Sequence, residues 1–262
     1  MQITYKTPAE IADMKHGGKI LGKILTHLAN EMKPGLTTKM IDDRARELLE
    51  KYKVEASFLG YHGFPGVICT PVNEEVVHTI PGERVLEEGD FITLDFGVIY
   101  KGWHTDSAIT IGVGKISKEK QDMIRAGEEA LFAAIKKVGP GVEIRVISET
   151  VQGVIEKNGY KIIRELIGHG IGRNLHEDPQ VPNYSADAGK QKLKAGMTIA
   201  IEPIFCAGKP GIKTLADDWN IVTKDGSMAA QVEHTIAITE DGYEILTERE
   251  DMKSVYETFY QS

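Results

Sequence analysis

The chain has 262 residues, of which 41% are apolar and 27% charged, as is ordinary for a globular protein. Its net charge of −8 argues against a general nucleic-acid or membrane-surface role, and no apolar stretch approaches the ~18 residues of a transmembrane helix. The first residues show no basic segment followed by an apolar run. We therefore expect a cytoplasmic protein without nucleic-acid specificity or a membrane span. Cys69 and Cys206 form no Cys-x-x-Cys pattern, which argues against a disulfide framework or a zinc knuckle.

The first half of the chain predicts two helices followed by strands. Thr7-Pro8-Ala9-Glu10 is a capping box with proline at the first helical position, and it predicts a helix to about residue 32. Pro34-Gly35 ends this helix, and residues 37–52 predict a second one. Strand and turn signals follow from 56 to 111. The apolar stripe of the second helix is expected at Met40, Ala45, Leu48 and Leu49.

The second half predicts the same order of elements. Ser117 is a helix cap, and the helix that it begins is expected to reach residue 138. A further helix over 142–157 ends at Asn158-Gly159, a left-handed stop. Strands are then expected at 161–166, 197–205 and 233–239.

Two stretches of the chain repeat one pattern, and each ends in an acid. Residues 86–95 align without a gap on residues 193–202, with leucine, glycine and isoleucine at matching places. The alignment places Asp95 on Glu202. A repeat this long is typical of a duplicated half-domain and not of a solenoid.

The duplication and the grouping of elements together predict the fold class. We expect an α+β fold in which helix pairs cover an antiparallel sheet core. A single domain should span 1–262, with pseudo-twofold halves of about 1–115 and 116–262.

Acidic residues in the first repeat indicate a charged site. If residues 91–111 form a hairpin that turns at Tyr100-Lys101, Asp95 and Asp106 lie opposite one another on the same face. The Cβ atoms of such a pair are about 4.5–5.5 Å apart, where two carboxylates repel. Either one of them is protonated, or a cation lies between them.

The second repeat supplies matching groups that favour the cation. Glu202 and Glu233 follow the aligned strands, and His169 lies among glycines that leave its ring unobstructed. Four converging carboxylates cannot all stay ionised without more than one positive charge beside them. One imidazole with four carboxylates suits Mn, Fe(II), Co or Zn.

Seven short segments spread over nearly the whole chain form a specific combination. Together they resemble the type I methionine aminopeptidases, which have the duplicated pita-bread fold. The resemblance implies that Asp95, Asp106, His169, Glu202 and Glu233 bind two divalent metal ions, with Asp106 and Glu233 bridging them. The segments are His78-Thr79-Ile80-Pro81, Gly89 to Gly97, Gly102 to Asp106, Gly168 to Gly172, His176-Glu177, Ile201-Glu202-Pro203 and Gln231 to Thr235.

The resemblance also implies an activity, the removal of the initiator methionine from peptides and nascent chains whose second residue is small. Glu202 would shuttle the proton of the attacking water. His78 and His176 would contact the substrate, one at the peptide group and one at the oxyanion. By the same resemblance, the slot for the methionine side chain is lined by Phe58, Tyr61, Phe64, Cys69, Leu175 and Trp219.

The resemblance implies a short bacterial form. Only 26 residues separate His176 from Glu202, which leaves no room for the helical insert of the type II enzymes, and no amino-terminal extension precedes the motifs. A monomer is expected, and a transient contact with the ribosome is left open. Phe58 and Leu175 depart from the bacterial pattern, in which a smaller residue and an aromatic residue are frequent.

Several alternatives remain at this point. A proline-specific aminopeptidase or prolidase would use the same five ligands, but usually carries an additional amino-terminal domain. A metal-free hydrolase or binding module on this scaffold would be expected to lose ligands, and a ribosome-docking protein would be expected to show a basic cluster. His62 lies 33 residues before Asp95, as His169 lies 33 before Glu202, so His62 is the duplicated counterpart of His169. His62, His104 and His234 are not expected to be ligands.

Overall fold

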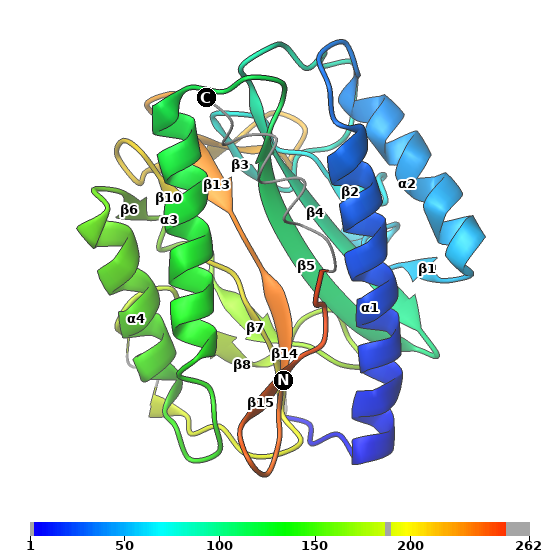
Figure 1. Cartoon of the computed structure of the whole chain (residues 1–262), viewed down its shortest axis with the longest axis vertical. Helices are drawn as coiled ribbons and strands as arrows, with labels where there is room; N and C mark the ends of the chain where they lie inside the picture. Colours follow the sequence, from blue (N-terminus) through cyan, green and yellow to red (C-terminus); the bar gives the residue numbers. More distant parts are fainter. Residues whose placement is uncertain (1–2, 187–189, 250–262) are drawn as a thin grey trace.

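The structure is a computed structural model that describes residues 3–186 and 190–249. Two helix pairs flank a central group of strands, with one pair on each side (Figure 1). Across the described residues, each helix is too short or too polar to cross a bilayer. The helices are α1 (Pro8–Glu31), α2 (Thr38–Tyr52), α3 (Lys118–Ile135) and α4 (Ile144–Lys157), with a short 3-10 turn η1 (Tyr61–Gly63).

Local capping sets the helix starts that the sequence predicts. Thr7 caps α1 in a complete capping box, and the side chains of Thr37 and Ser117 cap α2 and α3. The predicted stripe of α2 is wrong at Met40, which is 50% exposed, whereas its neighbour Ile41 is 1% exposed. The first turn of α2 therefore presents Ile41 to the core in place of Met40.

The first half is built on a long antiparallel hairpin. Strands β4 (Phe91–Tyr100) and β5 (Trp103–Gly112) pair along their whole length, and α1 packs against both. Two short strands, β1 (Glu55–Ala56) and β2 (Ile68–Cys69), pair with β4 on its other edge.

The register of this hairpin differs from the one expected. Asp106 pairs with Gly97, and Asp95 pairs with Ala108, so the two acids are diagonal neighbours and not directly opposed. The turn is Lys101-Gly102, where both residues have positive φ (50° and 73°). A two-residue turn of this kind matches the twist of a hairpin. The observed register differs from the expected one by two residues, an even number, so both acids still lie on the same face of the sheet.

The remaining strands, all from the second half except β3, form three further antiparallel sheets. The largest runs in the order β15-β14-β9-β7-β8, and the others run β13-β10-β6 and β11-β12-β3. Their strands are β3 (Glu75–Val77), β6 (Lys161–Ile162), β7 (Gly168–Gly170), β8 (Glu177–Val181), β9 (Thr198–Ile201), β10 (Ile204–Cys206), β11 (Ile212–Thr214), β12 (Ile221–Thr223), β13 (Ala229–Gln231), β14 (His234–Ile238) and β15 (Tyr243–Ile245).

The strand expected over 197–205 is interrupted at Glu202-Pro203. Strand β9 before the break pairs with β7 and β14, whereas β10 after it pairs with β6 and β13. Proline has no N–H to donate to a ladder, so the chain leaves one sheet and enters the next at this point. Glu202 therefore lies at the junction of two sheets.

Equivalent hydrogen bonds confirm the internal duplication. Leu86 N–H donates to Leu36 O at 2.8 Å, and Leu193 N–H donates to Val142 O at 2.8 Å. One turn later, Asp90 N–H donates to Glu87 O and Met197 N–H donates to Lys194 O, each at 3.1 Å. The glycines Gly89 and Gly196 of these turns have φ values of 91° and 87°. The α+β prediction with duplicated halves is therefore correct.

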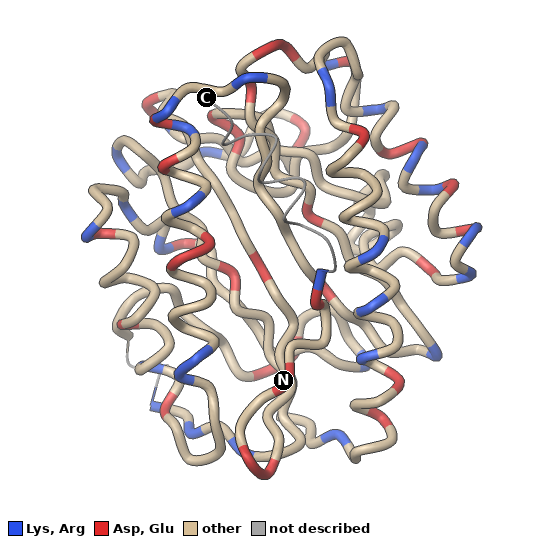
Figure 2. The backbone as a smooth tube through the Cα atoms, viewed as in Figure 1, with Lys and Arg blue, Asp and Glu red and all other residues tan. Residues whose placement is uncertain are grey.

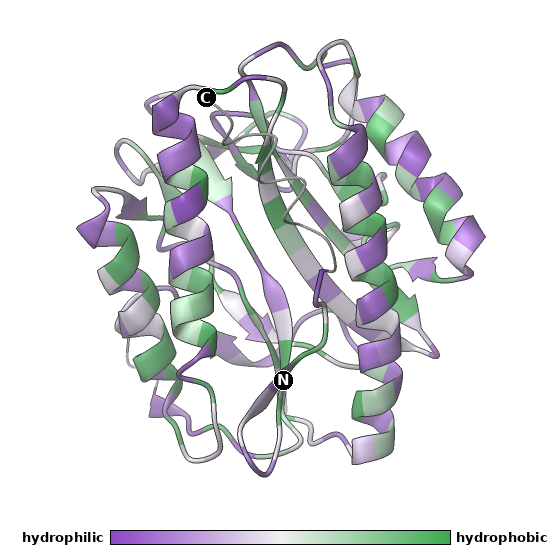
Figure 3. Cartoon of the chain, in the orientation of Figure 1, coloured by the Kyte–Doolittle hydropathy of each residue, from purple (hydrophilic) through white to green (hydrophobic). Residues whose placement is uncertain are grey.

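Each helix pair buries its apolar side against the strands, and the two halves meet at β5. Figure 3 shows apolar residues along the central strands and polar residues on the outward faces of the helices. At the junction, Glu233 N–H donates to Ala108 O at 2.9 Å, and the Ser107 hydroxyl donates to Glu233 O at 2.7 Å. Acidic residues nevertheless occur on the central strands, which otherwise carry few charged residues (Figure 2).

Candidate active site

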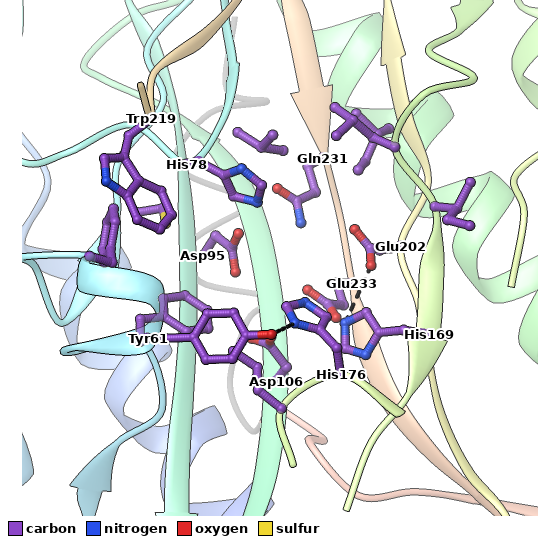
Figure 4. A pocket seen from close by; sticks show the side chains of 18 of the residues that line it. Tyr61, His78, Asp95, Asp106, His169, His176, Glu202, Trp219, Gln231 and Glu233 are labelled. Carbon is purple, nitrogen blue, oxygen red and sulfur yellow. Dashed lines mark hydrogen bonds and ion pairs between the residues drawn. The ribbon is translucent and has the colours of Figure 1, made fainter. Parts of the chain in front are cut away.

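A cavity of about 350 Å³ contains all the residues that the sequence predicted for the site. It receives side chains from both halves of the chain (Figure 4). The predicted residues on its wall are Phe58, Tyr61, Phe64, Cys69, His78, Asp95, Asp106, His169, Leu175, His176, Glu202, Trp219 and Glu233.

Three of these residues form the tightest group of donor atoms. One atom each from Asp106, His169 and Glu233 lie within 4.8 Å of one another, and all three residues are buried. Glu202 lies beside them, with its Oε1 atom 3.5 Å from His169 Nε2. Asp95 joins the group from the strand next to Asp106 (Figure 4).

The four carboxylates are buried together, which raises the pKa of each. Burial raises the pKa of Asp95 to about 7, against a hydrogen bond from Gln231 that lowers it. Burial and then the neighbouring acids raise the pKa values of Asp106, Glu202 and Glu233. The exposed fractions are 6% for Asp95, 5% for Asp106, 8% for Glu202 and 1% for Glu233, so water cannot screen the repulsion.

His169 is held as a neutral ring with one nitrogen free. Its Nδ1 lies 2.9 Å from Gly170 O, to which it donates, so that the Nε2 lone pair faces Glu202. Burial lowers the pKa of His169 to about 4. A neutral imidazole fixed by a backbone carbonyl in this way is the usual arrangement of a metal-ligating histidine.

Two further histidines face the cavity from opposite sides. His176 Nδ1 lies 2.6 Å from the Tyr61 hydroxyl, and burial lowers the pKa of His176 to about 3. His78 has a φ of 57°, a strained conformation for a residue other than glycine. Such strain is kept mainly at functional sites. Figure 4 shows both rings directed toward the carboxylates.

The expected slot forms a continuous apolar wall beside the acids. The Phe64 ring meets Phe58 and Trp219 edge-on, with centroid separations of 6.5 and 5.1 Å. Cys69 and Leu175 are 4% and 3% exposed and belong to the same buried cluster. Aromatic rings with one sulfur suit a thioether side chain.

The sequence reading missed several cavity residues. Gln231 was assigned no role, although it lies two residues before Glu233 in an extended segment and thus on the same face. Glu165, Leu166 and Ile167 also line the cavity. No pattern in the sequence marked them, because only the fold brings the segment between β6 and β7 beside Glu202, where Asn183 Nδ2 donates to the carbonyls of both Leu166 and Glu202.

Three other histidines, His62, His104 and His234, lie outside the tight group of donor atoms. His62 lines the cavity but is exposed, in a left-handed turn with φ of 48°. His104 Nδ1 lies 3.0 Å from the Ser57 hydroxyl, and His234 Nδ1 lies 2.9 Å from the Thr247 hydroxyl. Neither His104 nor His234 lines the cavity.

The chemistry of this donor set fits divalent metal ions. Asp95 Oδ1 and Glu233 Oε1 are buried without a hydrogen-bond partner among the described residues. Orphaned oxygens of this kind are costly unless a cation binds them. Four carboxylates with one neutral imidazole provide the hard oxygen and nitrogen donors that such ions prefer.

Comparisons with known proteins agree with this geometry. The profile of metallopeptidase family M24 matches residues 12–240. Methionine aminopeptidase 1 of Bacillus subtilis is 44% identical over 245 residues, which cover 94% of this chain and 99% of that protein. The methionine aminopeptidase of Escherichia coli K12 is 40% identical over 254 residues, 96% of each chain. The crystal structure of methionine aminopeptidase from Thermotoga maritima superimposes with a TM-score of 0.92 at 40% identity, over 95% of this chain and 100% of that one. The chain therefore belongs to the methionine aminopeptidases of metallopeptidase family M24.

Proposed function

We propose that the protein removes the amino-terminal methionine from peptides and nascent chains in a metal-dependent hydrolysis. The observation that carries this proposal is one cavity in which four buried carboxylates and a neutral His169 adjoin an apolar aromatic slot. The acids and the imidazole supply metal donors, and the slot supplies a place for one apolar side chain. Relatives at 40–44% identity over nearly the full chain support this pairing of functions.

We assign two divalent ions to Asp95, Asp106, His169, Glu202 and Glu233. Such a pair would polarise the scissile carbonyl, lower the pKa of the attacking water and hold the free amino group of the substrate. Manganese, iron(II), cobalt and zinc all suit the donor set. Asp106 and Glu233 both belong to the tight group of donors, and the family resemblance makes them the candidates to contact both ions.

The proton transfers are assigned to the protein's own side chains. Glu202 accepts a proton from water while the water oxygen adds to the carbonyl carbon of methionine. The same carboxyl then gives this proton to the peptide nitrogen as the C–N bond breaks, which releases methionine and a new amino terminus. Burial and the neighbouring acids raise the pKa of the Glu202 carboxyl in the metal-free site, which favours a group that can hold a proton and then release it.

His176 and His78 are assigned to the substrate. We assign the Tyr61 hydroxyl as the donor in its 2.6 Å contact with His176 Nδ1, which leaves the ring hydrogen on Nε2. That Nε2–H can donate to the carbonyl oxygen as negative charge develops on it. His78 approaches from the Trp219 side, where it can contact the peptide group.

The apolar slot determines which first residue of the substrate is accepted. Methionine enters among Phe58, Phe64 and Trp219, and an apolar slot discriminates between similar side chains by roughly 1–3 kcal/mol. The family resemblance implies a wall of the active site against the second residue, so we expect small second residues to be accepted and large or charged ones to be excluded.

One experiment tests the proposal directly. Metal-stripped protein is refilled with one ion at a time and assayed on Met-Ala-Ser, Met-Lys-Ser and Pro-Ala-Ser peptides. We expect no turnover without metal, rapid release of methionine from Met-Ala-Ser, and slow reaction of the other two. Full activity without metal, or faster cleavage of the proline-led peptide, would refute the assignment.

A further inference from the structure

A buried ion pair outside the cavity lies directly behind His176. Lys6 Nζ and Glu177 Oε2 are 2.9 Å apart, and their side chains are only 2% and 3% exposed. The Thr4 hydroxyl donates to the same Glu177 oxygen at 2.7 Å and accepts from Lys6 Nζ at 2.6 Å. The proposed chemistry uses none of these three residues, although Glu177 follows His176 directly in the chain.

The pair connects the amino-terminal segment to the loop that carries His176. This loop joins β7 to β8, and Glu177 is the first residue of β8. The second carboxylate oxygen of Glu177 accepts from Asn174 N–H at 3.1 Å, which closes the loop on itself. On the other side, Lys6 N–H donates to Gly196 O at 2.7 Å and fixes the segment to the turn before β9.

The loop is shaped to receive the lysine side chain. A Cβ atom built on Gly172 would lie 2.6 Å from Lys6 Cε and 2.8 Å from Glu177 Oε1, so a side chain there would displace the lysine from the carboxylate. The carbonyl of Gly172 accepts from His104 N–H at 2.8 Å, which holds the start of the loop on β5. The loop is therefore held at its start by β5 and at its end by Lys6.

A buried ion pair of this kind contributes little net stability, because desolvation of both charges offsets their attraction. Its effect on geometry is larger, because neither charge can move without losing its partner. We infer that Lys6 and Glu177 are positioning residues through which the amino-terminal segment sets the place of the His176 ring. This inference rests on the proposed role of His176 in the reaction.

The kinetic test compares Lys6→Met with Lys39→Met, which removes a lysine from an exposed pair with Asp43. We expect Lys6→Met to lower kcat by about 10- to 100-fold with KM nearly unchanged, as for a small misplacement of a catalytic group. In a His176→Ala background, Lys6→Met should cause almost no further loss. Lys39→Met should leave kcat at the parent value in both backgrounds. A loss of the same factor with and without His176, or an unchanged kcat with only a lower melting temperature, would overturn the inference.

A second measurement does not depend on activity. In zinc-loaded protein with ¹⁵N-labelled histidine, the ring signals of His176 are identified by their absence in His176→Ala. These signals should shift in Lys6→Met and in Glu177→Gln, which keeps the shape of the side chain, and should not shift in Lys39→Met. Unshifted signals in folded Lys6→Met or Glu177→Gln would refute the positioning role. If the parent protein cleaves no methionyl peptide, the proposed function fails while the spectra still test the ion pair.

Discussion

Replacement of Asp95 by asparagine should stabilise the metal-free protein at neutral pH, although it removes a proposed metal ligand. Burial raises the pKa of Asp95 from 3.8 to about 7. The folded protein therefore binds this proton more tightly than the unfolded chain does. As pH rises from about 4 to 7, the unfolded carboxyl ionises first, and the free energy of unfolding falls.

The size of the effect follows from the pKa. A rise from 3.8 to about 7 corresponds to roughly 4 kcal/mol, which is present at low pH and lost as pH passes 7. Asparagine does not titrate, so the stability of Asp95→Asn relative to the parent should increase by up to about this amount across the window. His169 and His176 act in the opposite direction, because their lowered pKa values add stability as pH rises through about 6.5. They are present in both proteins, so their contribution cancels in the difference.

The assay is urea unfolding of chelator-treated protein from about pH 4.5 to 7.5, within the range where the carboxyl titrates. At about pH 7.5, the addition of manganese should reverse the order, because the ion binds the folded parent more tightly than the variant. Parallel stability curves for the two metal-free proteins would refute the reasoning. So would a parent that gains stability over Asp95→Asn as pH rises.

Three other variants test separate parts of the structure. His176→Ala should lower kcat by about 10²–10³-fold, the usual range for loss of one oxyanion donor. Elemental analysis should find its metal content unchanged, and loss of a metal equivalent would make His176 a ligand. Gly22→Ala should lower the unfolding free energy in urea by about 1–3 kcal/mol, because its Cβ would lie 2.4 Å from Glu248 O. Gly153→Ala is the matched control, since a Cβ there meets nothing within 4 Å, and it should gain about 0.5–1 kcal/mol. Phe58→Cys should open the slot, so that kcat/KM for larger first residues rises relative to methionine; an unchanged ratio would remove Phe58 from the slot.

Features of this fold that depend on residues close together in the sequence could be predicted from the sequence. Thr37 Oγ1 accepts from Met40 N–H at 3.2 Å, and Ser117 Oγ accepts from Lys120 N–H at 3.3 Å. Each cap is complete within four residues, so its signal is complete in the sequence as well. Two acids of the cavity, Asp95 and Glu202, could be predicted for a different reason, because the duplication aligns them and so marks the same strand position twice.

Features set by contacts between distant segments could not be predicted in the same way. The hairpin register depends on Lys101 adopting a left-handed conformation, which composition alone does not reveal. The break at Glu202-Pro203 could be suspected from the proline, but not the change of sheet that follows it. Gln231 reaches Asp95 only because β13 packs across the two halves against β5, the partner strand of β4.

His62 and His169 show how one duplicated pattern came to serve two purposes. His169 lies in β7, where Cβ atoms on Gly168 and Gly170 would come within 2.4 and 2.2 Å of backbone carbonyls, so neighbouring strands hold the ring close to the acids. His62 lies in η1 with a left-handed backbone and an exposed side chain. The same turn directs Tyr61 to His176 and precedes Phe64 of the slot. The acids are thus shared by both halves, whereas the segment before them provides an imidazole in the second half and the aromatic wall in the first. Because the two segments diverged, one cavity is lined both by buried acids with a neutral imidazole and by an apolar aromatic wall.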